Sequence, residues 1–97
     1  MELPPNWEPI VGNLVHTLPG ELVRETAEGH ALFGIKTEAI ATRRGTDLDV
    51  LFRLADGSDR YAVVHLSWSK SADRPPFPWS EVYSSYDEFV LHSQEPV

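Results

Sequence analysis

Cysteine is absent from this 97-residue sequence. Without thiols, disulfides, thiolate metal sites and a cysteine nucleophile are all excluded. A domain that folds without disulfides is typical of a reducing compartment, so we expect a cytoplasmic protein.

Basic residues are few. Eight lysines and arginines stand against 15 aspartates and glutamates, which gives a formal net charge of -7. A surface with this balance repels phosphate backbones and anionic lipids, so nucleic acid and membranes are not expected partners. No segment approaches the ~20 apolar residues that cross a bilayer, and residues 1–20 lack the basic start and apolar run of an export signal.

Recognised motifs for phosphate or metal binding are also missing. The six glycines form neither a GxGxxG nor a GKS/T pattern. The four histidines, His16, His30, His65 and His92, lack HxH, HxxxH and HExxH spacing, so no metal and no cofactor are expected. His30 follows Gly29 and is expected at a helix C-terminus, where the helix dipole favours it.

Two helices are expected in the first third of the chain. Apolar residues follow helical spacing over residues 9–16, which predicts a short helix. A second helix is predicted over residues 19–28, because Pro19 suits a first turn and Gly29 suits a helix end.

A third helix is expected near the C-terminus. Ser85 is a suitable N-cap, Glu88 completes a capping box three residues later, and Pro96 stops the helix. Its predicted buried side comprises Tyr86, Phe89 and Val90. The preceding residues 80–84, SEVYS, are predicted to form a short strand.

From Ile35 the apolar pattern changes to alternation, which predicts strands. A two-residue turn at Gly45 and Thr46 sets the register of a first hairpin. That register sorts opposite charges and apolar residues together. The expected opposite pairs are Arg44–Asp47, Glu38–Arg53, Ala39–Phe52 and Ala41–Val50.

The next loop, in ADGSDR, is expected to have an odd number of residues, with Gly57 in the left-handed region. An even loop instead places Arg53 opposite Arg60 or mixes the two faces. The odd loop predicts the pairs Phe52–Ala62, Val50–Val64 and Leu48–Leu66. The covered face then carries Val50, Phe52, Val64, Leu66 and Trp68.

Together these elements predict a single α+β domain over residues 1–97. We expect a three- to four-stranded antiparallel meander with helices packed on one face.

The segments EGHALFG, DVLFRLADG and YAVVHLSW occur in this order. In this respect the chain resembles a group of short bacterial proteins of unassigned function, over roughly residues 20–90. The resemblance implies a bacterial, cytoplasmic protein and implies no activity.

The odd register also defines an outer sheet face. Ile40, Leu51 and Val63 form an apolar row across three strands, with Tyr61 and His65 beside it. A sheet face open to water normally carries polar residues, so this row needs a cover or a partner. Phe77, Trp79 or an N-terminal segment is the alternative to a partner.

His65 is expected opposite Asp49, which would hold the imidazole in one tautomer. Such a pair suits acid–base catalysis, but catalysis also needs a nucleophile, an oxyanion site or a metal. Neither Ser67 nor Ser69 belongs to a recognised motif. The arginines near the turns, among them Arg43, are expected to be neutralised by neighbouring aspartates.

The segment RPPFPW is too rich in proline for a regular sheet ladder and favours polyproline II. Arg74, Phe77 and Trp79 are of the residue types enriched at binding hot spots. The alternative is a proline-stiffened crossover whose aromatic side chains close the end of the core.

We therefore expect a small protein-interaction domain, one that neutralises or accompanies another protein. Its partner is expected to be a protein, of basic character because the chain is acidic, and a homodimer through the sheet face is an alternative. The alternative function is a small enzyme or ligand-binding domain that uses His65 and Asp49 in a cleft. The predicted binding residues are Arg74, Pro76, Phe77, Trp79, Ile40, Leu51, Val63 and His65.

Overall fold

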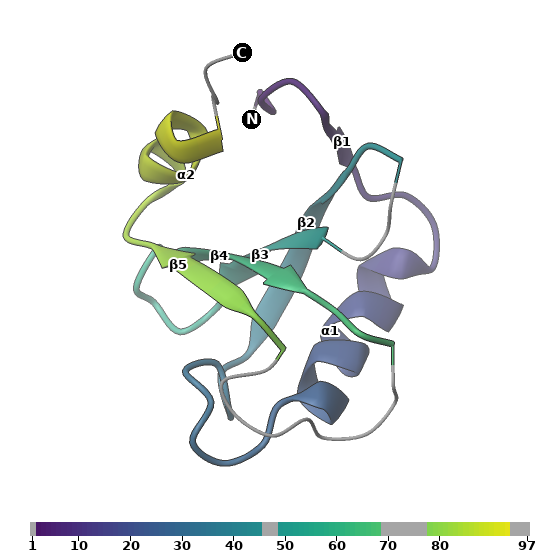
Figure 1. Ribbon diagram of the computed structural model, residues 1–97, viewed down its shortest axis with the longest axis vertical. Helices are drawn as coiled ribbons and strands as arrows, with labels where there is room; N and C mark the ends of the chain where they lie inside the picture. The colour runs from purple at the N-terminus through teal and green to yellow at the C-terminus, as the bar shows by residue number, and fades with distance from the viewer. Residues whose placement is uncertain (1, 46–48, 69–77, 94–97) are drawn as a thin grey trace.

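The computed structural model describes residues 2–45, 49–68 and 78–93 (Figure 1). The elements in chain order are β1 (Trp7–Pro9), α1 (Leu14–Glu25), β2 (Thr37–Arg43), β3 (Asp49–Leu54), β4 (Tyr61–His65), β5 (Ser80–Tyr83) and α2 (Tyr86–Ser93). The strands form one antiparallel sheet in the order β1-β2-β3-β4-β5. The α+β class and the antiparallel meander are confirmed, with five strands rather than three or four.

The additional strand is β1, which ends at Pro9. The separate helix expected over residues 9–16 is wrong, because only residues 14–16 of that range are helical and they form the start of α1. Trp7 pairs with Arg43 at the end of β2, and it is only 5% exposed. Gly12 then takes a positive φ of 66°, which turns the chain before α1. Burial of a large aromatic side chain against the sheet therefore overrides the local helical spacing.

The helix α1 begins at Leu14 and ends at Glu25, so the expected bounds of 19–28 are also wrong. Pro19 lies inside α1 rather than in its first turn, where it has no N–H to donate to the preceding turn. The helix stops because Thr26 adopts an extended backbone. The Thr26 hydroxyl donates to the Leu22 carbonyl at 3.0 Å, which satisfies one of the last helical acceptors.

The apolar side of α1 packs on the inner sheet face, which is the face that carries Val50, Phe52 and Val64. This confirms the predicted core face, with Trp68 packed at its margin. The buried residues of this core are Leu18, Leu22, Leu32, Val50, Phe52, Leu54, Ala62, Val64 and Leu66.

The register between β2 and β3 is correct in its first half only. Glu38 lies opposite Arg53 and Ala39 opposite Phe52, as predicted. A β-bulge between Ala39 and Ala41 then shifts the register, and Ala41 lies opposite Leu51 instead of Val50. An extra residue in one strand reverses the faces of the residues beyond it, so Ala41 joins the outer face.

The register between β3 and β4 agrees with the odd-loop prediction. Phe52 lies opposite Ala62 and Val50 opposite Val64. The loop has five residues, Ala55–Asp59, and Gly57 has the expected positive φ of 84°. The Gly45–Thr46 turn, the Arg44–Asp47 pair and the Leu48–Leu66 pair depend on residues 46–48, which lie outside the described part of the chain.

The two helices cover opposite faces of the sheet (Figure 1). The expectation that all helices pack on one face is therefore wrong. On the outer face α2 and β1 cover part of the predicted apolar row: Leu51 is fully buried beneath them, whereas Ile40 and Val63 are partly buried. The buried residues of this second core are Trp7, Ala41, Leu51, Tyr61 and Phe89.

The start of α2 carries the predicted cap in modified form. The Ser85 hydroxyl accepts from the Glu88 backbone N–H at 3.1 Å, as an N-cap does. The Glu88 carboxylate accepts instead from the N–H and hydroxyl of Ser84, at 3.2 and 2.7 Å. These bonds lower the pKa of Glu88. Phe89 is the buried residue of this helix, flanked by the partly buried Tyr86 and Val90, as expected.

Candidate functional site

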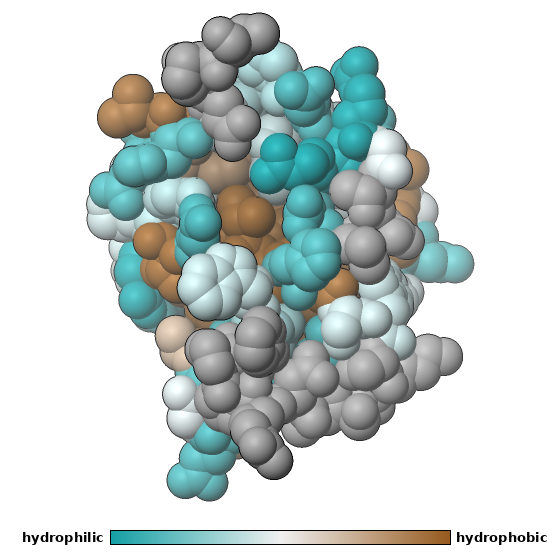
Figure 2. All heavy atoms as spheres, in the orientation of Figure 1, coloured by the Kyte–Doolittle hydropathy of each residue, from teal (hydrophilic) through white to brown (hydrophobic). Residues whose placement is uncertain are grey.

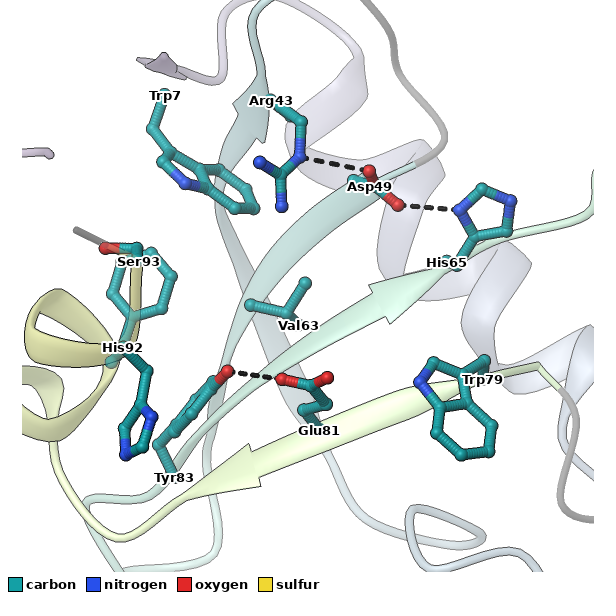
Figure 3. A pocket seen from close by; sticks show the side chains of 11 residues that line it. Trp7, Arg43, Asp49, Val63, His65, Trp79, Glu81, Tyr83, His92 and Ser93 are labelled. Atoms are coloured by element: carbon teal, nitrogen blue, oxygen red, sulfur yellow. Dashed lines mark hydrogen bonds and ion pairs between the residues drawn. The ribbon is translucent and has the colours of Figure 1, made fainter. Parts of the chain in front are cut away.

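A pocket of about 430 Å³ opens on the outer face between β5, α2 and the ends of β1 and β2 (Figure 3). Its position follows from the fold: α2 covers one part of the outer face and leaves the part near His65 open. In Figure 2, apolar surface shows in the middle of this view, framed by hydrophilic side chains. The lining residues are Trp7, Arg43, Asp49, Val63, His65, Trp79, Glu81, Tyr83, Phe89, His92 and Ser93.

One wall of the pocket is a chain of polar contacts centred on Asp49 (Figure 3). The Arg43 Nε donates to Asp49 Oδ2 at 3.1 Å, and His65 Nδ1 lies 2.6 Å from Asp49 Oδ1. The guanidinium of Arg43 also lies 4.9 Å from the ring centroid of Trp7, a cation–π contact. Asp49 therefore holds both partners at once, and the His65–Asp49 pairing predicted from the register is confirmed.

The opposite wall, the β5 wall, is formed by alternate residues of β5 and by the residue directly before this strand. Trp79, Glu81 and Tyr83 lie two residues apart and so point to the same face. The Tyr83 hydroxyl donates to Glu81 Oε2 at 2.6 Å. Burial, followed by this hydrogen bond and the charges of Glu81 and Glu88, raises the pKa of Tyr83 to about 12. His92 stacks on the Tyr83 ring at 5.4 Å.

The backbone that carries Trp79 is held on both sides. His65 N–H donates to the Trp79 carbonyl at 2.8 Å, which continues the β4–β5 ladder. Nearby, His30 Nε2 donates to the Pro78 carbonyl at 2.8 Å while His30 Nδ1 accepts from the Leu32 N–H at 2.9 Å. His30 is thus a buried neutral link between two loops, and the expected role at a helix C-terminus is wrong.

On the inner face a second buried polar group fixes the chain after β4. The Glu25 carboxylate accepts from the N–H and hydroxyl of Ser67, at 2.8 and 3.0 Å, and from the N–H of Trp68 at 2.7 Å. Trp68 has a positive φ of 59°, so these bonds hold a strained backbone. Burial and a hydrogen bond with Glu21 raise the pKa of Glu25, against the lowering effect of the three bonds it accepts.

The predicted binding residues are only partly brought together. Trp79, Val63 and His65 line the pocket, and Ile40 packs at the margin of the outer core. Leu51 is fully buried, so it is not available to a partner. Arg74, Pro76 and Phe77 lie outside the described residues.

Sequence reasoning missed several lining residues, above all Trp7, Arg43 and His92. No local signal points to Trp7 or His92, because they reach the pocket only when β1 and α2 fold over the sheet. The sequence could have indicated Glu81 and Tyr83, because they follow Trp79 at the two-residue period of a strand and so share its face.

Comparison with protein-family models, curated proteins and solved structures found no match to this chain. Among residues 2–45, 49–68 and 78–93, no three histidine or acidic side chains form a group suited to a metal ion. Within the same ranges, none of the helices has the length and apolar character needed to cross a membrane.

Proposed function

We propose that this protein is a small binding domain that recognises another protein through the outer-face pocket. The observation that carries the proposal is the exposure of Trp79, which is 56% exposed at the pocket wall. Tryptophan is among the residues most enriched at binding hot spots. A half-exposed tryptophan beside a pocket gains the remaining burial when a partner side chain fills that pocket.

The form of the pocket supports the same proposal. Its volume of about 430 Å³ suits one inserted side chain or a short segment. The backbone of Trp79 is fixed by His65, and that of Pro78 by His30. A site held in this way loses little conformational entropy on binding, which favours affinity.

Affinity capture with the immobilised full chain tests the proposal. We expect proteins captured from a lysate of the native cells to be lost with Trp79→Ala and retained with Phe33→Ala. Phe33 is a matched control because it is also an exposed aromatic residue, 50% exposed, and lines a separate pocket beside α1. Denaturant unfolding of both variants checks that each is folded. Equal capture by wild type and Trp79→Ala contradicts the proposal.

A small enzyme is the second candidate, and the contact between His65 and Asp49 at 2.6 Å favours it. His65 has an exposed side chain at the pocket rim, so substrate could reach its ring. Among the described lining residues, the hydroxyl groups are those of Tyr83 and Ser93. Tyr83 is a poor nucleophile because its pKa is raised to about 12. The Ser93 hydroxyl donates to the Val90 carbonyl at 3.0 Å. These contacts favour binding over nucleophilic catalysis at this pocket.

A further inference from the structure

The β5 wall of the pocket presents a π-surface and a carboxylate side by side (Figure 3). Trp79 is 56% exposed, and Glu81, two residues further along the strand, is exposed as well. Tyr83 contributes mainly its hydroxyl, because His92 stacks on its ring. The free aromatic surface of this wall therefore belongs to Trp79.

The charges of the two walls differ. On the Asp49 wall, the positive charge of Arg43 is paired with Asp49 at 3.1 Å, and Asp49 also holds His65. On the β5 wall, the hydrogen bond given to Glu81 comes from the neutral hydroxyl of Tyr83. Glu81 and Glu88 both act electrostatically on that hydroxyl, against a smaller opposite effect of Arg43. The β5 wall is therefore the negative side of the pocket.

We propose that the pocket receives an arginine side chain of the partner, with its guanidinium stacked on Trp79 and paired with Glu81. This inference rests on the proposed function. A guanidinium fits both groups because it is planar, stacks on aromatic faces and pairs with a carboxylate through two parallel hydrogen bonds. The net charge of -7 on the whole chain favours the approach of a basic partner.

An acidic or phosphorylated side chain fits less well. Glu81 repels it directly, and the charge of Arg43 is already balanced by Asp49. Lysine carries the same charge as arginine, but its compact ammonium neither stacks as a plane nor pairs bidentately. The pocket should therefore bind an arginine side chain more tightly than a lysine side chain.

The first test is a titration of the isotope-labelled full chain, followed by NMR, with the blocked peptide acetyl-Gly-Arg-Gly-amide. Its citrulline counterpart, which has the same shape without the charge, and its lysine counterpart are the comparisons. We expect saturable shifts at the Trp79 indole N–H and the Glu81 amide. The citrulline peptide and the Glu81→Gln variant should each bind about tenfold more weakly, the loss expected when a charge-assisted hydrogen bond is removed.

Glu28→Gln is the matched control variant, because Glu28 is an exposed glutamate outside the pocket lining. Its affinity for the arginine peptide should remain close to that of the wild type. Equal binding of the arginine and citrulline peptides overturns the inference. So does an equal affinity of Glu81→Gln and Glu28→Gln.

A competition experiment separates this inference from the proposed function. The arginine peptide is added during capture of native proteins by the wild-type chain. Capture that requires Trp79 but is not reduced by the arginine peptide overturns the inference and leaves the binding function intact. Capture that does not require Trp79 overturns the proposed function itself.

Discussion

His30 is a buried side chain, 7% exposed, that connects two loops through its ring nitrogens. The Leu32 N–H and the Pro78 carbonyl both depend on it. Replacement by alanine leaves these buried backbone groups without partners, and one such group costs about 1–3 kcal/mol. We therefore expect His30→Ala to lower the free energy of unfolding by about this amount or more.

Denaturant unfolding measures the effect, and His16→Ala provides the control because His16 is exposed on α1. The control should change stability by less than about 0.5 kcal/mol. If the two variants lose the same stability, the bonds of His30 do not contribute as inferred.

Because of Glu25, the stability of the fold should depend on pH in a direction that can be stated. The pKa of Glu25 in the folded protein is raised above the ordinary value of 4.5, first by burial and then by the hydrogen bond with Glu21. Because the pKa of Glu25 is higher in the folded protein, its contribution to the stability of the fold is fully present below the pKa it has in the unfolded chain. The contribution is lost as the pH rises through the folded pKa.

The test compares the free energy of unfolding of wild type and Glu25→Gln between about pH 4 and pH 8. We expect the stability of the wild type to fall relative to that of Glu25→Gln as the pH rises. The same comparison with Glu28→Gln, an exposed glutamate beyond the same helix, should show no such trend. If the stability of the wild type instead rises relative to that of Glu25→Gln as the pH increases, the inferred direction of the Glu25 pKa shift is wrong.

Among the elements, α2 is the one whose packing creates the site. Its Phe89 is 1% exposed and meets Trp7 edge to face at 5.4 Å and Tyr83 at 5.9 Å. We expect Phe89→Ala to cost about 3–5 kcal/mol of stability. That is a large part of the roughly 5–15 kcal/mol typical of a whole domain.

Thermal or denaturant unfolding detects this loss, and Leu91→Ala on the same helix is the control. Leu91 is 70% exposed, so its truncation should change stability by less than about 0.5 kcal/mol. A small effect of Phe89→Ala would mean that α2 is not required to cover the outer face.

At the level of the whole molecule, the net negative charge attracts a basic ligand wherever it approaches the surface. Because surface interactions are screened over about 10 Å at 0.1 M salt, affinity for the arginine peptide should decrease as sodium chloride is added. The decrease should be smaller for Glu81→Gln, which lacks the nearest charge. NMR titrations at low and high salt measure both trends. An affinity independent of salt contradicts an electrostatic contribution.

The pattern of alternation in the chain was sufficient to predict the β3–β4 ladder, and with it the contact between His65 and Asp49. Both follow from a period of two residues and an odd loop, which are local properties. The cap at Ser85 and the buried position of Phe89 were likewise readable, because they depend on spacing within one helix.

Tertiary structure alone decided what covers the outer face and where the pocket opens. The bulge between Ala39 and Ala41 has no mark in the sequence, and it brings Arg43 to Asp49. Trp7 is buried against α2, from the opposite end of the chain, because apolar burial does not depend on separation along the sequence. For the same reason, spacing could identify Leu51 as apolar and outward-facing but could not show that it is buried.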